Sequence, residues 1–263
     1  MATLHLNFRS DSISRSVYPV AFLPDYNGWN DVKPPYRTLY FLPGYSGGGL
    51  ETATFTNFAM YSALYGVAII LIDGENSFYL DDDLRGAKFS QYAGKEIVEA
   101  TRAMLPLSHK REDTYIGGIS MGGYGALING LRYADTFGKI AMLSPALEMH
   151  RRQRENPELC PIPLGELEGA IGKEETLIGT YKDPHFASKK AIAEGKLPEI
   201  FLGCGKQDEL VIAASRRYKA FMEEQGHPIT YYERDGLHDH TFWKQALTPL
   251  CEFLNGETAK GGK

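Results

Sequence analysis

The feature of this sequence that most constrains its fold is a series of short, unbroken apolar runs at residues 38–42, 67–72, 115–116, 140–143 and 200–202. Each run is closed by Gly, Pro, Asp or Ser, and such runs are typical of strands that are buried on both faces. Stretches with helical periodicity lie between them, for example at 90–105 and 211–225. This alternation predicts an α/β fold in which helices cover both faces of a mostly parallel sheet, with the ligand site at the carboxyl ends of the strands.

The N-terminal segment has a different pattern. Leu4, Leu6 and Phe8 alternate with polar residues, and a second apolar stretch follows at 17–23. Alternation of this kind is typical of strands with one solvated face, so we expect an antiparallel pair at the start of the chain. A further strand is expected at 229–233.

No linker or internal repeat divides the chain, so we predict a single domain over residues 1–256. A polar segment rich in arginine and proline begins near residue 148, and short helical pieces follow it. We interpret residues 146–195 as an excursion over the sheet. Residues 257–263 are expected to form a flexible tail.

Charge and composition exclude several classes of protein. The 28 Lys and Arg residues against 33 Asp and Glu residues give a net charge of −5, which has the wrong sign for a nucleic-acid partner. The longest strongly apolar run is too short for a bilayer, and the first residues turn polar early, so we expect a cytoplasmic protein that does not enter a membrane. Its 3 cysteines form no C-x-x-C pair, which argues against a disulfide framework and a zinc knuckle.

The motif G-x-S-x-G occurs at residues 118–122, with Ser120 at its centre. It follows a strand-like run and precedes helix-compatible residues, which is the context of a nucleophile elbow. In such an elbow small residues allow a sharp strand-to-helix turn that exposes the serine hydroxyl, and the next amide, of Met121, points at an oxyanion. The other interpretation is a glycine-rich turn that lets a helix pack closely on a strand, and the flanking elements favour the nucleophile.

Three segments of the sequence together resemble the esterase D family of α/β-hydrolases. They are G-I-S-M-G-G-Y-G-A at 118–126, G-E-N-S-F-Y at 74–79 and G-L-H at 236–238. The family groups tributyrin-type carboxylesterases and S-formylglutathione hydrolases, with acetylxylan and feruloyl esterases as relatives. The resemblance spans nearly the whole chain and implies an α/β-hydrolase fold with a mostly parallel sheet.

Enzymes with this fold order their catalytic residues as serine, acid and histidine, so the acid should follow a strand beyond Ser120. Asp208 follows the apolar strand expected at 199–204, after three intervening residues, and is the candidate, with Glu209 as the second choice. A carboxylate there could reach a histidine on the next loop and hold its tautomer. The other interpretation is that Asp208 caps the helix that follows, since Asp is a favoured N-cap residue.

Two histidines, His238 and His240, are candidates for the base. The resemblance implies a glycine-rich approach to the base and an aromatic residue five positions later, which His238 satisfies with Trp243. His240 is then expected beside the site without acting as the base. Because the other histidines form no cluster with ligand spacing, we expect neither a metal nor a cofactor.

The glycine-rich segment at 42–49 is where α/β-hydrolases supply the second oxyanion amide, and the resemblance implies the backbone N–H of Tyr45. The segment has Pro43 and Gly44 where relatives often carry His-Gly. It lacks a Gly-Lys-Ser/Thr ending, which argues against a phosphate-binding loop. Phe78, Tyr79 and Trp243 are expected as walls of the substrate cleft, although a place in the core is the commoner role for any one aromatic residue.

These candidates together predict a serine carboxylesterase that hydrolyses short-chain acyl esters, from acetyl to butyryl, through an acyl-enzyme. Acetylated or feruloylated sugars are one class of substrate that the resemblance implies. The alternatives are an S-formylglutathione-type thioesterase, which uses the same residues, and a non-catalytic binding module on the hydrolase fold. The expected partner is a small-molecule ester, and a homo-oligomer is allowed.

Overall fold

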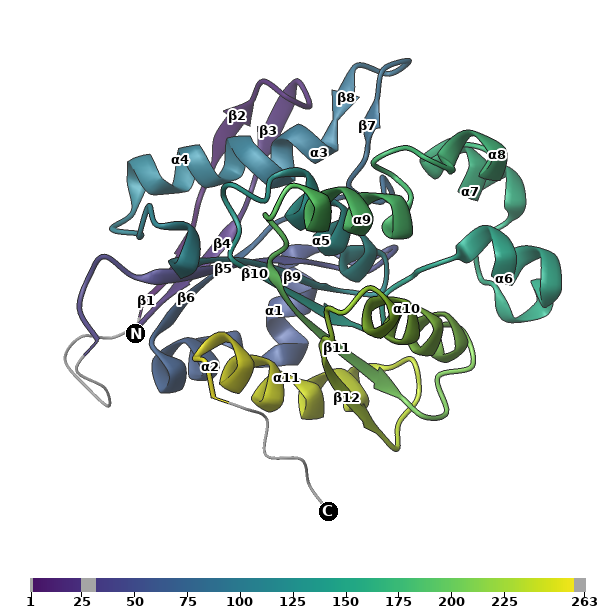
Figure 1. Cartoon of the computed structure of the whole chain (residues 1–263). Helices are drawn as coiled ribbons and strands as arrows, with labels where there is room; N and C mark the ends of the chain where they lie inside the picture. Colours follow the sequence, from purple (N-terminus) through teal and green to yellow (C-terminus); the bar gives the residue numbers. More distant parts are fainter. Residues whose placement is uncertain (1, 25–31, 258–263) are drawn as a thin grey trace.

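The computed structural model describes residues 2–24 and 32–257, and its centre is an eight-stranded sheet with helices on both faces (Figure 1). The strands of this sheet, in spatial order, are β1 (Ala2–His5), β4 (Val20–Leu23), β6 (Val67–Leu71), β5 (Arg37–Leu42), β9 (Thr114–Ile119), β10 (Lys139–Leu143), β11 (Glu199–Gly205) and β12 (Thr230–Arg234). All neighbours from β6 to β12 pair in parallel, whereas β4 pairs antiparallel with β1 and with β6. The predicted mostly parallel sheet with antiparallel N-terminal strands is confirmed.

The N-terminal strands are divided differently from the prediction. Phe8 does not continue β1 but starts a separate two-stranded ribbon, β2 (Phe8–Ser10) with β3 (Arg15–Val17). The turn of this ribbon is held from a distant part of the chain, because the carboxylate of Glu96 accepts hydrogen bonds from the Ser10 hydroxyl and the Asp11 amide, each at 2.6 Å. A contact across 85 residues leaves no signal in the local apolar pattern.

Eleven α-helices complete the described part of the chain, and Figure 1 places α1, α2 and α11 together on one side of the sheet. The helices are α1 (Gly49–Thr56), α2 (Phe58–Tyr65), α3 (Phe89–Gln91), α4 (Ile97–Met104), α5 (Met121–Arg132), α6 (Met149–Glu155), α7 (Leu164–Ile171), α8 (Glu174–Leu177), α9 (Pro184–Ala193), α10 (Ile212–Glu224) and α11 (His240–Leu254). Shorter elements are the π-helical turn Tyr92–Glu96, the 3-10 turns Arg111–Asp113 and Pro157–Leu159, and the hairpin of β7 (Asp81–Asp82) and β8 (Ala87–Lys88).

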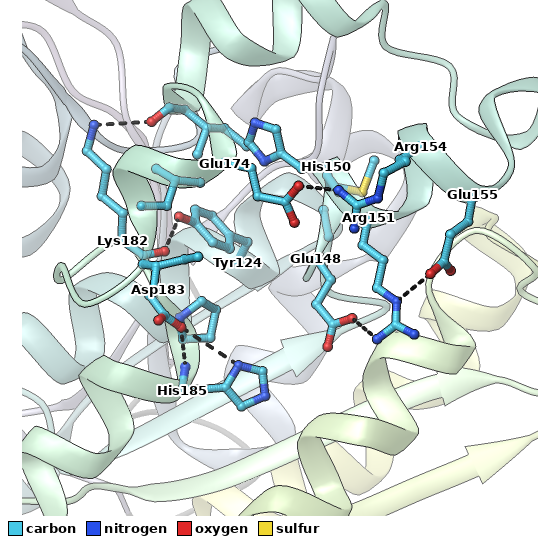
Figure 2. A pocket seen from close by; sticks show the side chains of 16 residues that line it. Tyr124, Glu148, His150, Arg151, Arg154, Glu155, Glu174, Lys182, Asp183 and His185 are labelled. Carbon is cyan, nitrogen blue, oxygen red and sulfur yellow. Dashed lines mark hydrogen bonds and ion pairs between the residues drawn. The ribbon is translucent and has the colours of Figure 1, made fainter.

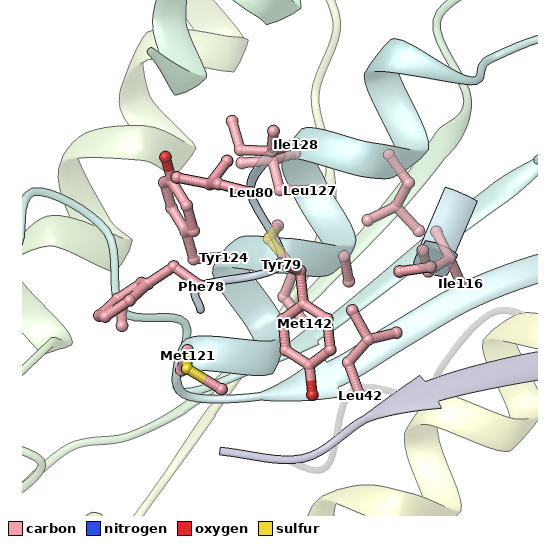
Figure 3. Packing of buried hydrophobic residues seen from close by; sticks show 14 of the residues in the cluster. Leu42, Phe78, Tyr79, Leu80, Ile116, Met121, Tyr124, Leu127, Ile128 and Met142 are labelled. Carbon is pink, nitrogen blue, oxygen red and sulfur yellow. The ribbon is translucent and has the colours of Figure 1, made fainter. Parts of the chain in front are cut away.

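The apolar strands are continuous because both faces of the sheet are covered. Along β5, Tyr40 and Leu42 belong to the core on the α5 side, whereas Leu39 and Phe41 belong to the core on the α11 side. Figure 3 shows the first of these cores, where side chains of α5 such as Leu127 pack over the strands. Successive strand residues point to opposite faces, so every position of a doubly covered strand must be apolar.

The segment between β10 and β11 contains α6, α7, α8 and α9, and α6 to α8 project from one end of the sheet in Figure 1. This segment corresponds to the expected excursion at 146–195. The interpretation of residues 1–256 as one domain stays a prediction, and residues 258–263 of the expected tail lie outside the described residues. Within the described ranges, no helix combines the length and the apolar character that crossing a membrane requires.

Candidate active site

Ser120 lies at the sharp turn between β9 and α5, with a backbone φ of 53°. A positive φ is unfavourable for a residue with a side chain, and such strain is typical of a serine presented at an elbow. The turn depends on two glycines. A Cβ added to Gly118 would lie 2.6 Å from the Leu42 carbonyl oxygen, and one added to Gly122 would lie 1.9 Å from the same oxygen. Only residues without a side chain fit between this turn and β5.

A continuous chain of hydrogen bonds joins Asp208, His238 and Ser120. The His238 Nδ1 atom lies 2.8 Å from Asp208 Oδ2, and its Nε2 atom lies 3.0 Å from Ser120 Oγ. The Asp208 side chain is fully buried, whereas 23% of the His238 side chain is exposed. This arrangement orients the imidazole so that its Nε2 atom can take the proton of the serine hydroxyl.

The acid and the base meet because they follow neighbouring parallel strands, β11 and β12. The two loops are joined directly: the Gln207 amide donates to the Gly236 carbonyl at 3.0 Å, and the Gly236 amide donates to Gln207 Oε1 at 2.7 Å. Gly205 is required for this approach, since its added Cβ would lie 2.3 Å from the Gly236 oxygen. The backbone of one loop therefore sets the position of the other.

Asp208 is not the N-cap of the following helix, because α10 begins at Ile212 and its N-cap is Val211. Its Oδ1 atom accepts from the Val211 amide at 3.3 Å and so ties the carboxylate to the loop that leads into this helix. The Cys204 sulfur lies 4.0 Å from Asp208 Oδ2. Burial, with the charge of Asp208 as a second cause, raises the pKa of the Cys204 thiol to about 12 and keeps it protonated. Glu209 is exposed to solvent.

His240 is the first residue of α11 and lies to the side of the hydrogen-bonded chain. Its ring stacks on Phe55 with centroids 4.2 Å apart and lies edge-on to Trp243 at 5.0 Å. Trp243 also lies edge-on to His238, at 5.2 Å. The structure thus places His238, and not His240, between the acid and the serine. In residues 2–24 and 32–257, no group of three or more His, Cys, Asp or Glu side chains is arranged to hold a metal ion.

The loop after β5 passes next to the serine. A Cβ added to Gly44 would lie 3.5 Å from Ser120 Cβ, so the backbone just before Tyr45 passes next to the nucleophile. The other expected donor, the Met121 amide, is the first of α5 and has no acceptor within the helix. Tyr45 and Met121 line the same cavity as Ser120, and their role as oxyanion donors stays a prediction.

Side chains from outside the loop hold the backbone of Tyr45 in place. The Tyr79 hydroxyl donates to the Pro43 carbonyl at 3.0 Å, and the Ser46 amide donates to Asn76 Oδ1 at 2.8 Å. The Tyr45 phenol donates to Glu166 on α7. Burial and the Glu166 carboxylate raise the pKa of this phenol to about 12, so it stays a donor at neutral pH.

Ser120 and His238 open into a cavity of about 350 Å³ whose walls are largely apolar. Phe78 and Trp243 line it, as expected. Tyr79 does not line it and the expectation for this residue is corrected: it is fully buried beside α5, under the loop that carries Tyr45 (Figure 3). Phe78 and Tyr79 both have a positive φ, of 53° and 56°. With this unusual backbone the two neighbouring side chains separate: Phe78 lines the cavity and Tyr79 is buried in the core.

Part of the cavity wall comes from the excursion, which the sequence did not reveal. Met149, Pro161 and Ile162 line the cavity together with the serine. The available signals were the apolar residues Met149 and Ile162 in a largely polar segment, and these do not say which surface each residue covers. The excursion therefore contributes directly to the shape of the candidate site.

Comparison with known proteins agrees with this geometry. The model of the Esterase family, described as "Putative esterase", matches residues 10–254. The chain belongs to the Esterase family. This esterase is 34% identical over 270 residues to an acetyl esterase of Caldicellulosiruptor saccharolyticus, a match that covers 97% of this chain and 98% of the relative.

Two solved structures from Staphylococcus aureus have the same fold as this esterase. One is FphF, a fluorophosphonate-binding serine hydrolase, with a TM-score of 0.85 and 26% identity. The other is an S-formylglutathione hydrolase, FrmB, with a TM-score of 0.83 and 27% identity. Each match covers 97% of this chain and 98% of the other. The esterase thus has the α/β-hydrolase fold and is a serine hydrolase acting on carboxylic esters, which confirms the resemblance seen in the sequence.

Proposed function

We propose that this esterase hydrolyses short-chain acyl esters, from acetyl to butyryl, through a covalent acyl-enzyme. The observation that carries the proposal is the unbroken chain from buried Asp208 through His238 to Ser120, with distances of 2.8 and 3.0 Å, which ends in an apolar cavity. Such a chain activates a serine hydroxyl, which is a weak nucleophile without a neighbouring base.

In the proposed mechanism Ser120 Oγ attacks the ester carbonyl while His238 Nε2 takes the hydroxyl proton. Asp208 holds the imidazole and stabilises its positive charge. The amides of Tyr45 and Met121 donate to the oxyanion of the tetrahedral intermediate. The intermediate collapses, His238 returns its proton to the leaving alcohol, and the acyl group stays on Ser120. Water activated by His238 then attacks the acyl-enzyme and releases the carboxylic acid.

The size and lining of the cavity support a short acyl group. Its volume of about 350 Å³ is at the low end of ligand pockets, which span about 300–1,000 Å³. Phe78 and Trp243 occupy part of the wall, and buried Ile162 covers it from the excursion. The similarity to an acetyl esterase points in the same direction. Phe78 and Trp243 are therefore proposed as substrate-binding residues.

The proposal is tested by the hydrolysis of p-nitrophenyl acetate, butyrate and octanoate. We expect the wild type to prefer the two shorter esters and Ser120→Ala to fall to the background rate. Ser16→Ala, an exposed serine of β3, is the matched control and should keep full activity. Equal, slow rates for wild type and Ser120→Ala, with the same circular dichroism, would refute the proposal.

A second candidate is a thioesterase that acts on S-formylglutathione. It is favoured by the 27% identity and TM-score of 0.83 with the S. aureus S-formylglutathione hydrolase. The same three residues would serve both reactions, so the geometry does not separate them. A large preference in kcat/KM for S-formylglutathione over p-nitrophenyl acetate would replace the ester by the thioester as the substrate. The cytoplasmic location and a homo-oligomeric state stay predictions.

A further inference from the structure

The cavity that contains Ser120 is lined by a carboxylate that the proposed mechanism does not use, the side chain of Glu51 on α1. Glu51 is exposed to solvent, and an exposed glutamate carries a negative charge at neutral pH. Among the described residues that line this cavity, Glu51 is the one acidic residue, and none is a lysine or an arginine. A substrate at Ser120 therefore meets a lining with one negative charge and no permanent positive charge.

The first turn of α1 holds Glu51 in place beside the cavity. The Gly49 amide, at the start of α1, donates to Asp73 Oδ1, which follows β6. Buried Thr52, the residue after Glu51, lines the same cavity. The amino end of a helix carries a partial positive charge, and the Asp73 carboxylate already offsets it. The charge of Glu51 is therefore left to act on the cavity.

Two arginines near this cavity are engaged by other acceptors. Arg15 lines a neighbouring cavity, where it pairs with Glu75. Arg152 donates to the carbonyl oxygen of Leu210, a lining residue, at 3.0 Å and also to that of Glu209. Neither arginine lines the cavity that contains Ser120. The positive charges in this region are thus directed away from the carboxylate of Glu51.

Another cavity, of about 550 Å³, shows the contrasting arrangement (Figure 2). There Arg151 donates to Glu155 at 2.8 Å and Arg154 pairs with Glu174, so that cations and carboxylates of the lining offset one another. Among the described residues that line the cavity of Ser120, Glu51 has no such partner. A charged group of a substrate would therefore experience the field of Glu51 without a compensating cation.

The cavity is small enough for this charge to act on every part of a bound ester. A sphere of about 350 Å³ is roughly as wide as the Debye length, which is about 8 Å at physiological ionic strength. Two unit charges at about this separation in water change a binding constant by about two- to threefold. Glu51 therefore attracts a positive group, repels a negative one and has little effect on a neutral one.

We propose that Glu51 determines specificity by charge, so that the enzyme disfavours esters with a negative charge and favours those with a positive charge. This inference rests on the proposed function, because it places the ester carbonyl at Ser120. It acts against the thioesterase candidate, since glutathione carries two carboxylates and one ammonium group at neutral pH and is therefore an anion. The proposal concerns the charge of the substrate and applies to the acyl part and the alcohol part alike.

The test uses three aryl acetates that share the acetyl group and the phenyl ring. They are anionic p-acetoxybenzoate, neutral p-nitrophenyl acetate and cationic p-acetoxyphenyltrimethylammonium. Glu51→Gln should raise kcat/KM for the anion and lower it for the cation, each by about threefold at low salt, with the change for the neutral ester between them. Glu51→Lys reverses the charge and should enlarge both shifts to about tenfold. In about 1 M salt, where the Debye length is about 3 Å, the shifts should nearly disappear.

The matched control is Glu99→Gln, because Glu99 is also an exposed glutamate in the first turn of an eight-residue helix, α4, and does not line the cavity. It should leave all three values of kcat/KM unchanged. Equal effects of Glu51→Gln on the three esters, shifts that persist in high salt, or the same shifts in Glu99→Gln would overturn the inference. A wild type that hydrolyses the neutral ester but not the cationic one would overturn it as well. If the wild type hydrolyses none of the three, the proposed function itself fails, and this inference fails with it.

Discussion

The hydroxyl of Tyr79 offers a direct test of how the oxyanion loop is held. Tyr79→Phe removes the bond to the Pro43 carbonyl, which is 3.0 Å long and lies in a region where Tyr79 is fully buried. Water cannot replace the lost donor, so the carbonyl is left without a partner at a cost of about 1–3 kcal/mol in the free energy of unfolding. The phenyl ring keeps its packing against Gly125 and Gly74.

The same change should slow catalysis because the amide of Tyr45 is two residues from Pro43. Complete loss of an oxyanion donor costs about 10²–10³-fold in kcat, and a displaced donor retains part of this stabilisation. We therefore expect about a tenfold loss in kcat for p-nitrophenyl acetate, equivalent to about 1.4 kcal/mol, with KM little changed. Urea unfolding and steady-state kinetics measure the two effects separately.

Tyr218→Phe is the control for this experiment. The Tyr218 hydroxyl is also buried, and it forms a 2.8 Å hydrogen bond with Ser188, on elements away from the site. The Tyr218→Phe variant should lose a similar free energy of unfolding, while its kcat stays at the wild-type value. If Tyr79→Phe loses stability but keeps full kcat, the loop does not depend on this bond and the argument is refuted.

Two further predictions concern Glu96 and the elbow. Burial opposes ionisation of Glu96, but hydrogen bonds from Ser10 and from the backbone of the β2–β3 turn outweigh it and lower its pKa. A lowered pKa gives stability that is present above the ordinary range of Glu and is lost as the pH falls through the folded-state pKa. Glu96→Gln should thus unfold at a lower urea concentration than the wild type at pH 7. The difference in free energy of unfolding between the two proteins should shrink below about pH 4. A difference that does not change with pH would contradict the role given to Glu96. Gly122→Ala should reduce kcat by about 100-fold or prevent folding, because its Cβ would lie 1.9 Å from a carbonyl oxygen, whereas Gly169→Ala, with open space around its Cβ, should keep wild-type activity in the same assay.

The sequence predicted the parts of the fold that depend on local patterns. The runs at 38–42 and 67–72 became β5 and β6 because a strand covered on both faces must be apolar throughout. The ribbon of β2 and β3 was not separated from β1 in advance. Its position depends on Glu96, far along the chain, and a pattern of alternation specifies neither a partner nor a register.

In the candidate site, too, the residues of local motifs could be predicted from the sequence, whereas contacts between distant segments could not. Ser120 was recognisable because an elbow needs glycines at fixed distances from the serine. The order of the remaining residues along the chain pointed to Asp208 and His238, which the structure brings together. The position of Tyr79 was not accessible, because it depends on two consecutive positive φ angles that non-glycine residues rarely adopt. The walls from the excursion were missed because they are contacts between distant segments.

The strand order has a consequence for how enzymes of this shape diversify. β10 lies between β9, which precedes Ser120, and β11, which precedes Asp208, yet no residue of the proposed mechanism follows β10 itself. The connection that leaves β10 therefore emerges directly over the gap between nucleophile and acid. Its length and composition can change by insertion or exchange without moving the strands that carry the chemistry. Replacing this one segment would therefore change the substrate while the residues of the proposed mechanism keep their positions.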